Sequence, residues 1–420
     1  MIKYIKRNLS VELFLPLIWG TLAGTFNQGL NFITNIFLAR FLKNDFGELI
    51  LYQSTNSMLQ TFSLVGLGTM VTVLIAKNLK LQDKELVGSI ISNSYIIVTI
   101  LSIFIAFICI IFAIIPQTTI LFWKFNSTIL FLFVIIWFIF SSIDALQVAL
   151  LIGFSAFKHI AIASFVKGVI SLLLISSLAF IYGIEGALLG YAIGFMISAC
   201  LNLYFLQKNI QEYSVKISLK INIPLIWKII NAGIPIFLAA LFITPVQWFI
   251  NNYIFSIKNG HIALSLFGIA NQWMILIQFF PLQISKVVLP FLSGTNNYRR
   301  KTEHTGLFLS IFIAILLIFL SFIFEKQIIH LYGFEHSQSK EIFRIMLLSA
   351  FFSILNLYFG QTIIASGKPW LRTLADMIIA LALFITFIVI INYSVMLALP
   401  IAYCIALFIG SATMIILKNK

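Results

Sequence analysis

The stretch FITPVQWFINNYIF, residues 242–255, sets polar side chains inside an otherwise apolar run. Its polar and helix-interrupting positions are Pro245, Gln247, Trp248, Asn251 and Asn252. A second stretch, GIANQWMILIQFFP at residues 268–281, has the same character. Amide side chains that face hydrocarbon cost free energy, so we expect both stretches to turn their amides toward the interior of a membrane protein.

Composition indicates that lipid is the main solvent of this chain. Of its 420 residues, 61% are hydrophobic and 10% are charged, whereas a soluble domain carries about 25% charged residues. The net charge of +14 comes from lysines and arginines in short gaps between apolar runs, which is typical of membrane proteins and argues against a nucleic-acid partner. The three cysteines lie far apart and predict neither a disulfide framework nor a metal site, and we expect no cofactor.

Twelve apolar segments are long enough to cross a bilayer, which takes about 20 helical residues. We therefore predict an all-α integral membrane protein. Most of the 27 lysines and arginines fall in loops on the side of the N-terminus, and the positive-inside rule then places both termini in the cytoplasm. The segments cover roughly residues 13–39, 48–76, 88–115, 127–152, 160–182, 185–206, 224–255, 262–290, 305–325, 341–365, 371–391 and 395–417.

A basic linker at residues 207–222 divides the chain into two halves of six segments each, residues 1–212 and 213–420. Residues 151–175 align weakly with residues 361–385. An even number of spans keeps both halves in the same orientation, so we expect two parallel six-helix lobes.

Amides and tryptophans gather on the first two helices of each half. Many of them recur at three- and four-residue spacing, which places them on a common helical face. Hydrogen bonds between helices, at about 0.6 kcal/mol each, explain one or two amides per helix, and the bias shared by both halves favours a hydrated central cavity. The candidate substrate-binding residues are Asn27, Asn31, Asn35, Gln53, Asn56, Gln60, Gln247, Trp248, Asn251, Gln272, Trp273 and Lys286.

Ionisable residues inside spans are functional candidates because charge in hydrocarbon is costly. Lys286 either extends to the membrane surface or presents a cation to an anionic headgroup. Asp144 lies in the middle of the fourth segment and is the candidate for a coupling-ion site, or for a partner of a basic residue. Lys167 and Asp376 lie close to span ends, where extension to the interface is the simpler interpretation.

Prolines and glycines inside spans predict kinks and close packing. A proline removes a backbone hydrogen bond and permits a bend. Gly186, Gly190 and Gly194 repeat every four residues, a small-residue face that lets two helices approach closely. The hinge candidates are Pro235, Pro245 and Pro281.

Two common enzyme signatures, the GxxxxGK[ST] phosphate loop and HExxH, do not occur in the sequence. The five histidines lie at loops or span edges without metal-ligand spacing. Because no loop is long enough to form a catalytic domain, we predict that the protein is not an enzyme.

Five stretches resemble one family of transporters. FLARFLKNDFGELILYQS (37–54) and GLGTMVTVLIAKN (66–78) resemble its opening, and IEGALLGYAI (184–193) is similar to its sixth helix. GIPIFLAALFITPVQWFINNYI (233–254) and ANQWMILIQFFP (270–281) resemble the start of its second half. The family is that of the Wzx-type polysaccharide flippases of bacterial O-antigen and capsule pathways, within the multidrug/oligosaccharidyl-lipid/polysaccharide exporter superfamily.

The resemblance implies two six-helix lobes around a central V-shaped cavity. It implies alternating-access translocation of undecaprenyl-pyrophosphate-linked oligosaccharide repeat units, as in lipopolysaccharide biosynthesis, from the cytoplasmic to the periplasmic leaflet of the bacterial inner membrane. The partners it implies are the lipid-linked oligosaccharide, membrane lipid and the O-antigen polymerase and ligase machinery, and we expect a monomer. Amides can hydrogen-bond sugar hydroxyls, and tryptophan rings can pack on sugar faces.

Other functions stay open at the level of sequence. A cation-coupled multidrug exporter of the same superfamily would favour an acidic, aromatic pocket, for which Asp144 alone is thin support. A lipid II flippase would carry further helices and more cavity arginines. An O-antigen polymerase, which is an enzyme, would show a large outer loop with arginines, whereas the longest outer loop is about residues 326–340. A structural scaffold leaves the polar helix faces unexplained.

Overall fold

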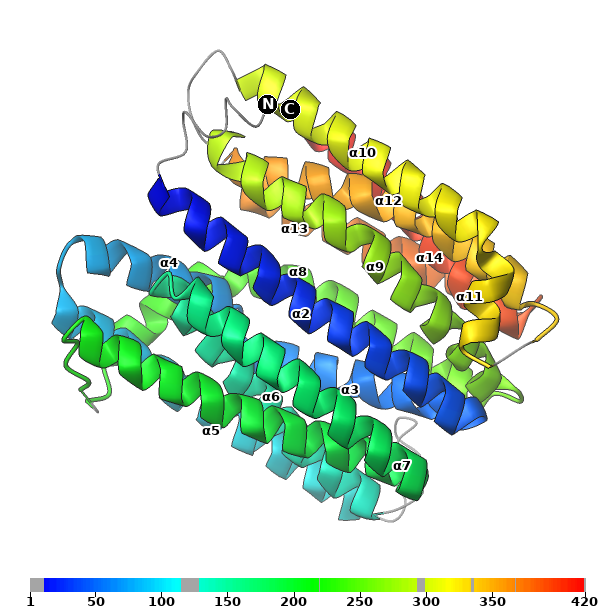
Figure 1. Cartoon of the computed structure of the whole chain (residues 1–420), viewed down its shortest axis with the longest axis horizontal. Helices are drawn as coiled ribbons and strands as arrows, with labels where there is room; N and C mark the ends of the chain where they lie inside the picture. The colour runs from blue at the N-terminus through cyan, green and yellow to red at the C-terminus, as the bar shows by residue number, and fades with distance from the viewer. Residues whose placement is uncertain are drawn as a thin grey trace. The chain divides into compact units, whose positions relative to one another are not determined.

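The computed structural model describes residues 11–114, 128–218, 220–292, 299–333, 336–366 and 368–418. Every regular element among them is helical, as the all-α prediction expects (Figure 1). In chain order these elements are α2 (Val11–Leu42), the 3-10 helix η1 (Lys43–Asp45), α3 (Phe46–Leu64), α4 (Leu67–Lys80), α5 (Lys84–Ile114), α6 (Thr128–Gly153), α7 (Phe157–Glu212), α8 (Ile223–Ser256), α9 (Gly260–Leu292), α10 (Arg299–Ile323), α11 (Glu325–Leu331), α12 (Ser339–Ala365), α13 (Pro369–Ile391) and α14 (Val395–Lys418).

The helices have the length and composition of membrane spans. Within the described ranges, nine helices are long and apolar enough to cross a membrane, or ten if the two helical segments on either side of Gly66 form one bent span. The protein is therefore a multi-pass helical membrane protein. The full set of twelve spans stays a prediction.

The longest helix, α7, is two antiparallel arms joined at Gly183. Gly183 has φ 61° and ψ −136°, a conformation that residues with a Cβ rarely adopt. A Cβ at Gly190 would lie 2.8 Å from the Cα of Ile175, and one at Gly194 would lie 2.9 Å from the Oγ of Ser171. Gly190 lies against Ile175, and Gly194, further along the second arm, lies against Ser171, earlier on the first arm. The two arms therefore run antiparallel. The close packing predicted for this glycine face is confirmed.

The predicted second span, residues 48–76, is not one straight helix but is broken into α3 and α4. Val65 and Gly66 have positive φ angles of 45° and 69°, and the helical segments on the two sides are bent by 45°. A Cβ at Gly233, on α8, would lie 2.9 Å from the carbonyl oxygen of Val65. Two backbones meet at this break, and the two glycines permit their close approach.

Contacts divide the chain into two compact units. Unit 1 comprises the described residues of Met1–Thr34 and Leu59–Phe237, and unit 2 comprises those of Asn35–Met58 and Leu238–Lys420. The helices α2, α3 and α8 each contribute residues to both units.

In unit 1, α6 packs along α7, and α4 and α5 pack on α6. The fully buried side chains of Leu67, Ile75, Leu146 and Leu150 belong to its core. In unit 2, α9 packs against α10, α12 and α14, and α13 packs along α14. Lipid is as apolar as these cores, so tight packing and polar contacts between helices hold each unit together.

The short helix α11 is fixed to α12 by an ion pair. Arg344 donates to both carboxylate oxygens of Glu325, from Nε at 2.8 Å and from Nη2 at 2.7 Å. The Arg344 guanidinium also lies 5.2 Å from the ring centroid of Phe322. Hydrogen bonds from Arg344 lower the pKa of Glu325 below its ordinary value of 4.5, because they favour the charged carboxylate.

Candidate functional site

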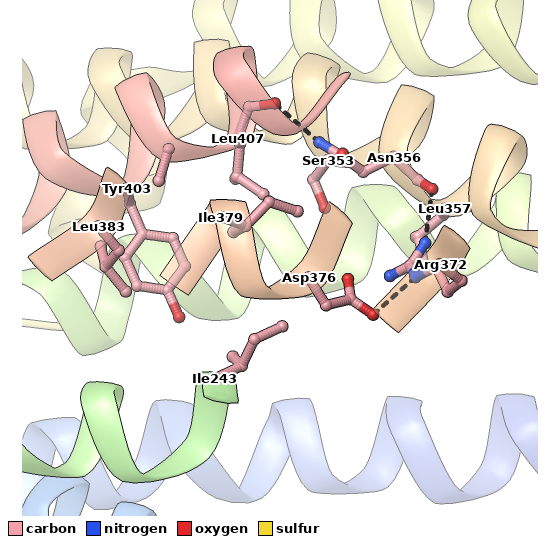
Figure 2. Close-up of a pocket in the computed structure, with 11 residues that line it drawn as sticks. Ile243, Ser353, Asn356, Leu357, Arg372, Asp376, Ile379, Leu383, Tyr403 and Leu407 are labelled. Atoms are coloured by element: carbon pink, nitrogen blue, oxygen red, sulfur yellow. Dashed lines mark hydrogen bonds and ion pairs between the residues drawn. The ribbon is translucent and has the colours of Figure 1, made fainter. Parts of the chain in front are cut away.

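The guanidinium of Arg372, on α13, is the centre of a buried polar cluster in unit 2 (Figure 2). Its Nε donates to Asp376 Oδ2 at 2.8 Å, one turn further along the same helix. Its Nη1 donates to the carbonyl oxygen of Asn356, on α12, at 3.0 Å and lies 3.4 Å from the Sδ of Met414, on α14. A Cβ at Gly360 would overlap Nη1, so the glycine leaves the space for the guanidinium. One cation thus links three helices.

A cavity of about 180 Å³ lies beside this ion pair, inside unit 2 (Figure 2). Its walls are mostly apolar and come from Ile243 of α8 and from residues of α12, α13 and α14. Asp376 and Asn356 line it, each is 4% exposed, and the Oδ1 atom of each has no hydrogen-bond partner within the described part of the chain. The space suffices for several water molecules, which take about 30 Å³ each in the liquid.

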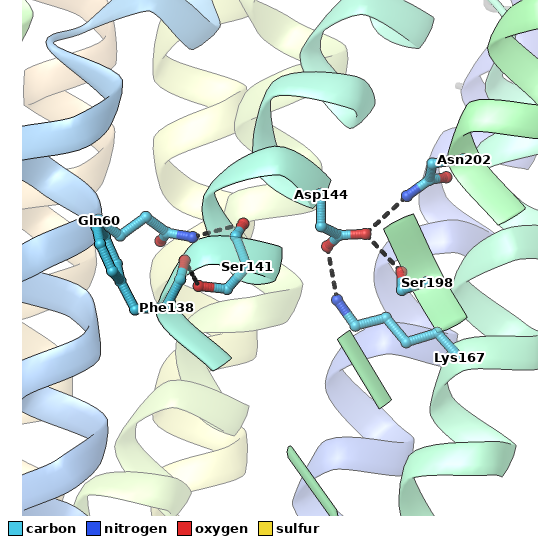
Figure 3. Close-up of polar contacts among 7 residues, drawn as sticks. All are labelled: Gln60, Phe138, Ser141, Asp144, Lys167, Ser198 and Asn202. Atoms are coloured by element: carbon cyan, nitrogen blue, oxygen red, sulfur yellow. Dashed lines mark hydrogen bonds and ion pairs between the residues drawn. The ribbon is translucent and has the colours of Figure 1, made fainter. Parts of the chain in front are cut away.

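In unit 1 the carboxylate of Asp144, on α6, is the centre of a second buried cluster (Figure 3). Asp144 is 5% exposed. Lys167 Nζ, from the first arm of α7, donates to Oδ2 at 2.8 Å. From the second arm, Ser198 Oγ donates to Oδ1, and Asn202 Nδ2 donates to the same atom at 2.8 Å. One carboxylate thus holds α6 and both arms of the α7 hairpin together.

The ammonium of Lys167 has an aromatic partner as well. Its Nζ lies 3.8 Å from the ring centroid of Phe195, which is cation–π distance. Next to it, Trp137 stacks on Tyr191 with ring centroids 4.5 Å apart. The interpretation of Lys167 as a residue that extends to the interface is therefore wrong: its charge is balanced inside the helix packing.

The interpretation of Asp376 as a residue that extends to the interface is also wrong, because its carboxylate is buried against Arg372. For Asp144, the structure supplies the basic partner that sequence analysis left open. An additional coupling ion at Asp144 would have to share the carboxylate with the Lys167 ammonium.

The predicted lining residues differ widely in exposure. Asn35, Asn56, Trp248 and Asn251 are buried. Gln53, Gln60, Gln247, Gln272 and Trp273 are partly buried, and Asn27 and Asn31 are exposed. For Lys286, the structure describes the backbone of α9, and the side chain lies outside the described residues.

The stretch at residues 242–255 makes specific contacts with neighbouring helices of unit 2. Trp248 Nε1 donates to Thr55 Oγ1, on α3, at 3.0 Å, and the side chain of Gln247 lies near the hydroxyl of Tyr403, on α14. Asn251 is 1% exposed, and its Oδ1 has no hydrogen-bond partner among the described residues. The stretch therefore includes a helix-to-helix hydrogen bond and two buried acceptors, Oδ1 of Asn251 and Oδ1 of Asn252, that have no partner among the described residues.

Two other candidates also contact protein. Gln60 Nε2 donates to the carbonyl oxygen of Ser141, on α6, at 2.9 Å (Figure 3). Trp273 packs edge-on against Phe343 with ring centroids 6.3 Å apart. Both candidates thus contact neighbouring helices, and none of the predicted lining residues lines the cavity beside Arg372.

The three hinge candidates lie within continuous helices. Pro235 and Pro245 are inside α8, and Pro281 is inside α9. None of them ends its helix, so a hinge at these positions stays a prediction.

Sequence reasoning missed the polar cluster around Arg372. The signal was available, because Arg372 and Asp376 are four residues apart and four-residue spacing brings side chains together on a helix. Asn356 contributes through its backbone carbonyl oxygen, which no sequence pattern identifies. In unit 1, the pairing of Asp144 with Lys167 depends on the fold, since the two residues lie on different helices.

Long apolar helices joined by buried ion pairs and amides define the class of this molecule, a polytopic helical membrane protein. The chain belongs to the polysaccharide biosynthesis protein family, whose model matches residues 17–296. A stretch of 131 residues is 27% identical to the EPS I polysaccharide export inner membrane protein EpsE of Ralstonia nicotianae, and equally to that of Ralstonia solanacearum. This stretch covers 30% of this chain and 30% of each relative.

Solved structures of the MOP superfamily share the fold. A multidrug resistance MATE family transporter in an inward-facing conformation aligns with a TM-score of 0.74 and 15% identity, over 94% of this chain and 96% of the other. The lipid II flippase MurJ, in an inward closed conformation, aligns with a TM-score of 0.72 and 16% identity, over 96% and 88%. A MOP superfamily transporter from Pyrococcus furiosus aligns with a TM-score of 0.72 and 13% identity, over 96% of this chain and 94% of the other. At these identities the alignments show that the chain shares the fold of these membrane proteins.

Proposed function

We propose that this protein is a flippase for lipid-linked oligosaccharides, which moves undecaprenyl-pyrophosphate-linked repeat units from the cytoplasmic to the periplasmic leaflet by alternating access. The observation that carries the proposal is membership of the polysaccharide biosynthesis protein family over residues 17–296. Two likenesses support it. A relative of part of the chain is named a polysaccharide export inner membrane protein, and a lipid II flippase has the same fold.

The proposed architecture is twelve spans in two six-helix lobes, residues 1–212 and 213–420, with both termini in the cytoplasm. The described helices support this count when each arm of α7 is one span and α3 with α4 form another. The remaining spans are then α2, α5, α6, α8, α9, α10, α12, α13 and α14. Alternating access uses the cavity that the family resemblance implies between two such lobes.

The chemistry of the candidate lining suits a sugar headgroup. Hydroxyl groups need donors and acceptors to replace water, and amides supply both. Asn27 and Asn31, four residues apart on α2, present exposed amides, and the buried Oδ1 of Asn251 has no hydrogen-bond partner within the described ranges. Amide side chains can bind many patterns of sugar hydroxyls without holding the sugar by charge.

The pyrophosphate requires a cation that is not already neutralised. Lys167 and Arg372 are each bound to a carboxylate at 2.8 Å, so neither is available without breaking a buried ion pair. We propose Lys286 as the residue that meets the pyrophosphate.

Gene deletion with complementation tests the function. We expect loss of surface polysaccharide and accumulation of cytoplasm-facing lipid-linked repeat units, both restored by the wild-type chain. Lys286→Ala should restore export poorly, whereas Lys80→Ala, at an exposed lysine at the end of α4, should restore it fully. Unchanged polysaccharide together with altered drug tolerance would contradict the proposal and favour a multidrug exporter.

A further inference from the structure

The connection from the second arm of α7 to α8, together with the first turns of α8, carries exposed lysines and exposed large apolar residues. Its sequence is YSVKISLKINIPLIWK, residues 213–228, and it contains no aspartate or glutamate. We call these residues the linker segment. The proposed transport cycle assigns it no role.

One side of the linker segment is anchored in unit 1. Val215 and Leu225 are each 8% exposed and belong to the unit's hydrophobic core. The backbone N–H of Asn222 donates to Asn93 Oδ1, on α5, at 3.0 Å. The Asn222 side chain in turn accepts the N–H of Leu225 at 3.0 Å, which caps the start of α8. The segment therefore has a defined outward surface.

That outward surface is strongly apolar. Ile217 is 50% exposed, Ile221 64%, Ile223 62% and Trp227 61%. Four large apolar side chains are thus exposed within a segment of sixteen residues. Exposed apolar residues at this density indicate a surface that contacts lipid or protein and not water.

The linker segment is basic as well. Lys216, Lys220 and Lys228 are exposed, and each is a sequence neighbour of an exposed apolar residue, Ile217, Ile221 or Trp227. Long lysine side chains can bury their stems in an apolar layer while their ammonium groups stay at its polar boundary. This combination fits the boundary between hydrocarbon and anionic headgroups, and tryptophan favours the same depth.

The place of the linker segment in the fold supports that match. It connects α7 and α8, and both are long and apolar enough to span a membrane. A short connection between two spans lies at the membrane surface. An apolar protein partner would match the isoleucines but would leave three lysines without counter-charges, whereas an anionic lipid surface matches both.

We propose that the linker segment docks on anionic phospholipid headgroups, with its isoleucines and Trp227 inserted at the interface. That the leaflet is the cytoplasmic one rests on the orientation given in the proposed function. Docking holds the connection between the two halves of the chain at headgroup depth.

A fluorescence measurement on the full chain in lipid nanodiscs tests the proposal. Ile221→Cys is labelled with the environment-sensitive dye NBD, in a background with Cys109, Cys200 and Cys404 replaced by alanine. Each lysine near an anionic surface changes the ratio of docked to free segment about fivefold. In discs with 30% phosphatidylglycerol we expect NBD emission that is blue-shifted, quenched by lipid-attached nitroxide and protected from iodide. In purely zwitterionic discs we expect a free segment whose NBD emission is quenched by iodide.

Two triple variants supply the comparison. Lys216→Gln, Lys220→Gln and Lys228→Gln together should shift the docked ratio about a hundredfold toward the free state. The same change at Lys77, Lys80 and Lys84, exposed lysines elsewhere in unit 1, should leave it unchanged. Elution of each variant as a monodisperse peak controls for folding.

Two outcomes overturn the proposal. A dye that is equally accessible to iodide in both kinds of disc shows that the surface faces water. A dye that is shielded in both kinds and insensitive to lipid nitroxide shows that protein covers it. The measurement uses no transport substrate, so a failure of the flippase proposal would leave its result unchanged.

Discussion

Removal of the Lys167 ammonium should destabilise unit 1 more than any surface lysine does. In Lys167→Met, Asp144 keeps the donors Ser198 and Asn202 on Oδ1, but its Oδ2 loses the ammonium of Lys167 as donor. Removing one partner of a buried ion pair costs about 3–5 kcal/mol. The Lys167 side chain is 16% exposed and that of Asp144 is 8% exposed, so partial solvent access places the cost near 3 kcal/mol.

The assay is thermal unfolding of the detergent-solubilised chain, followed as the loss of the monodisperse size-exclusion peak. For a unit of about 200 residues, 1 kcal/mol shifts the midpoint by about 2–4 °C. Lys167→Met should therefore lower the midpoint by roughly 6–12 °C. The double variant Asp144→Asn with Lys167→Met leaves no buried charge and should recover most of that loss.

Lys158→Met is the matched control, since Lys158 is an exposed lysine on the same helix, 6.0 Å from the ring centroid of Trp19. Its midpoint should move by less than about 2 °C. Two results would refute the reasoning. One is a Lys167→Met midpoint no lower than that of Lys158→Met, and the other is a double variant less stable than Lys167→Met.

Three further predictions concern the α7 hairpin, the α11 ion pair and the stretch at residues 242–255. Gly190→Val should prevent the two arms of α7 from packing, because a Cβ there would lie 2.8 Å from a backbone atom. The yield of folded protein, measured by size exclusion, should fall several-fold. Gly29→Val, with open space around its Cβ position, should keep the wild-type yield. Glu325 has a lowered pKa, so its pairing with Arg344 stabilises the fold fully above the ordinary pKa of 4.5, and this stabilisation is lost as the pH falls through the lower folded-state pKa. The difference in thermal unfolding midpoint between wild type and Glu325→Gln should therefore be present at pH 7 and vanish at strongly acid pH. A difference that grows on acidification would contradict the lowered pKa of Glu325. Trp248→Phe removes the hydrogen bond to Thr55. A double-mutant cycle with Thr55→Val should give a coupling free energy of unfolding of about 0.6 kcal/mol. A coupling free energy of zero would mean that the hydrogen bond contributes nothing to stability.

Much of the helical architecture can be predicted from sequence, because a bilayer imposes a minimum length on apolar segments. The sixth segment shows how far this goes. Gly186, Gly190 and Gly194 predict a close helix contact, and the structure places them against the first arm of α7. The break at Gly66 was missed, because a single glycine in an apolar run does not reveal that another backbone approaches it.

The candidate site was only partly predictable. Hydropathy and spacing identify which residues are polar and on which face of a helix they lie, but not which helix faces them. Gln60 and Trp248 illustrate this, since their partners Ser141 and Thr55 come from other helices. The ion pair between Asp144 and Lys167 likewise depends on how α6 packs on α7, whereas Arg372 and Asp376 could have been paired from their spacing alone.

We propose that the chain moves a lipid-linked oligosaccharide across a bilayer. The most direct measurement uses proteoliposomes that contain the purified chain and undecaprenyl-pyrophosphate-linked oligosaccharide loaded in the inner leaflet, with an external glycosidase that cleaves only exposed headgroups. We predict that the protected inner-leaflet pool becomes cleavable over time in proteoliposomes with the wild-type chain, and that protein-free liposomes keep it protected. Equal protection in both preparations, with the reconstituted chain shown to be folded, would contradict the claim.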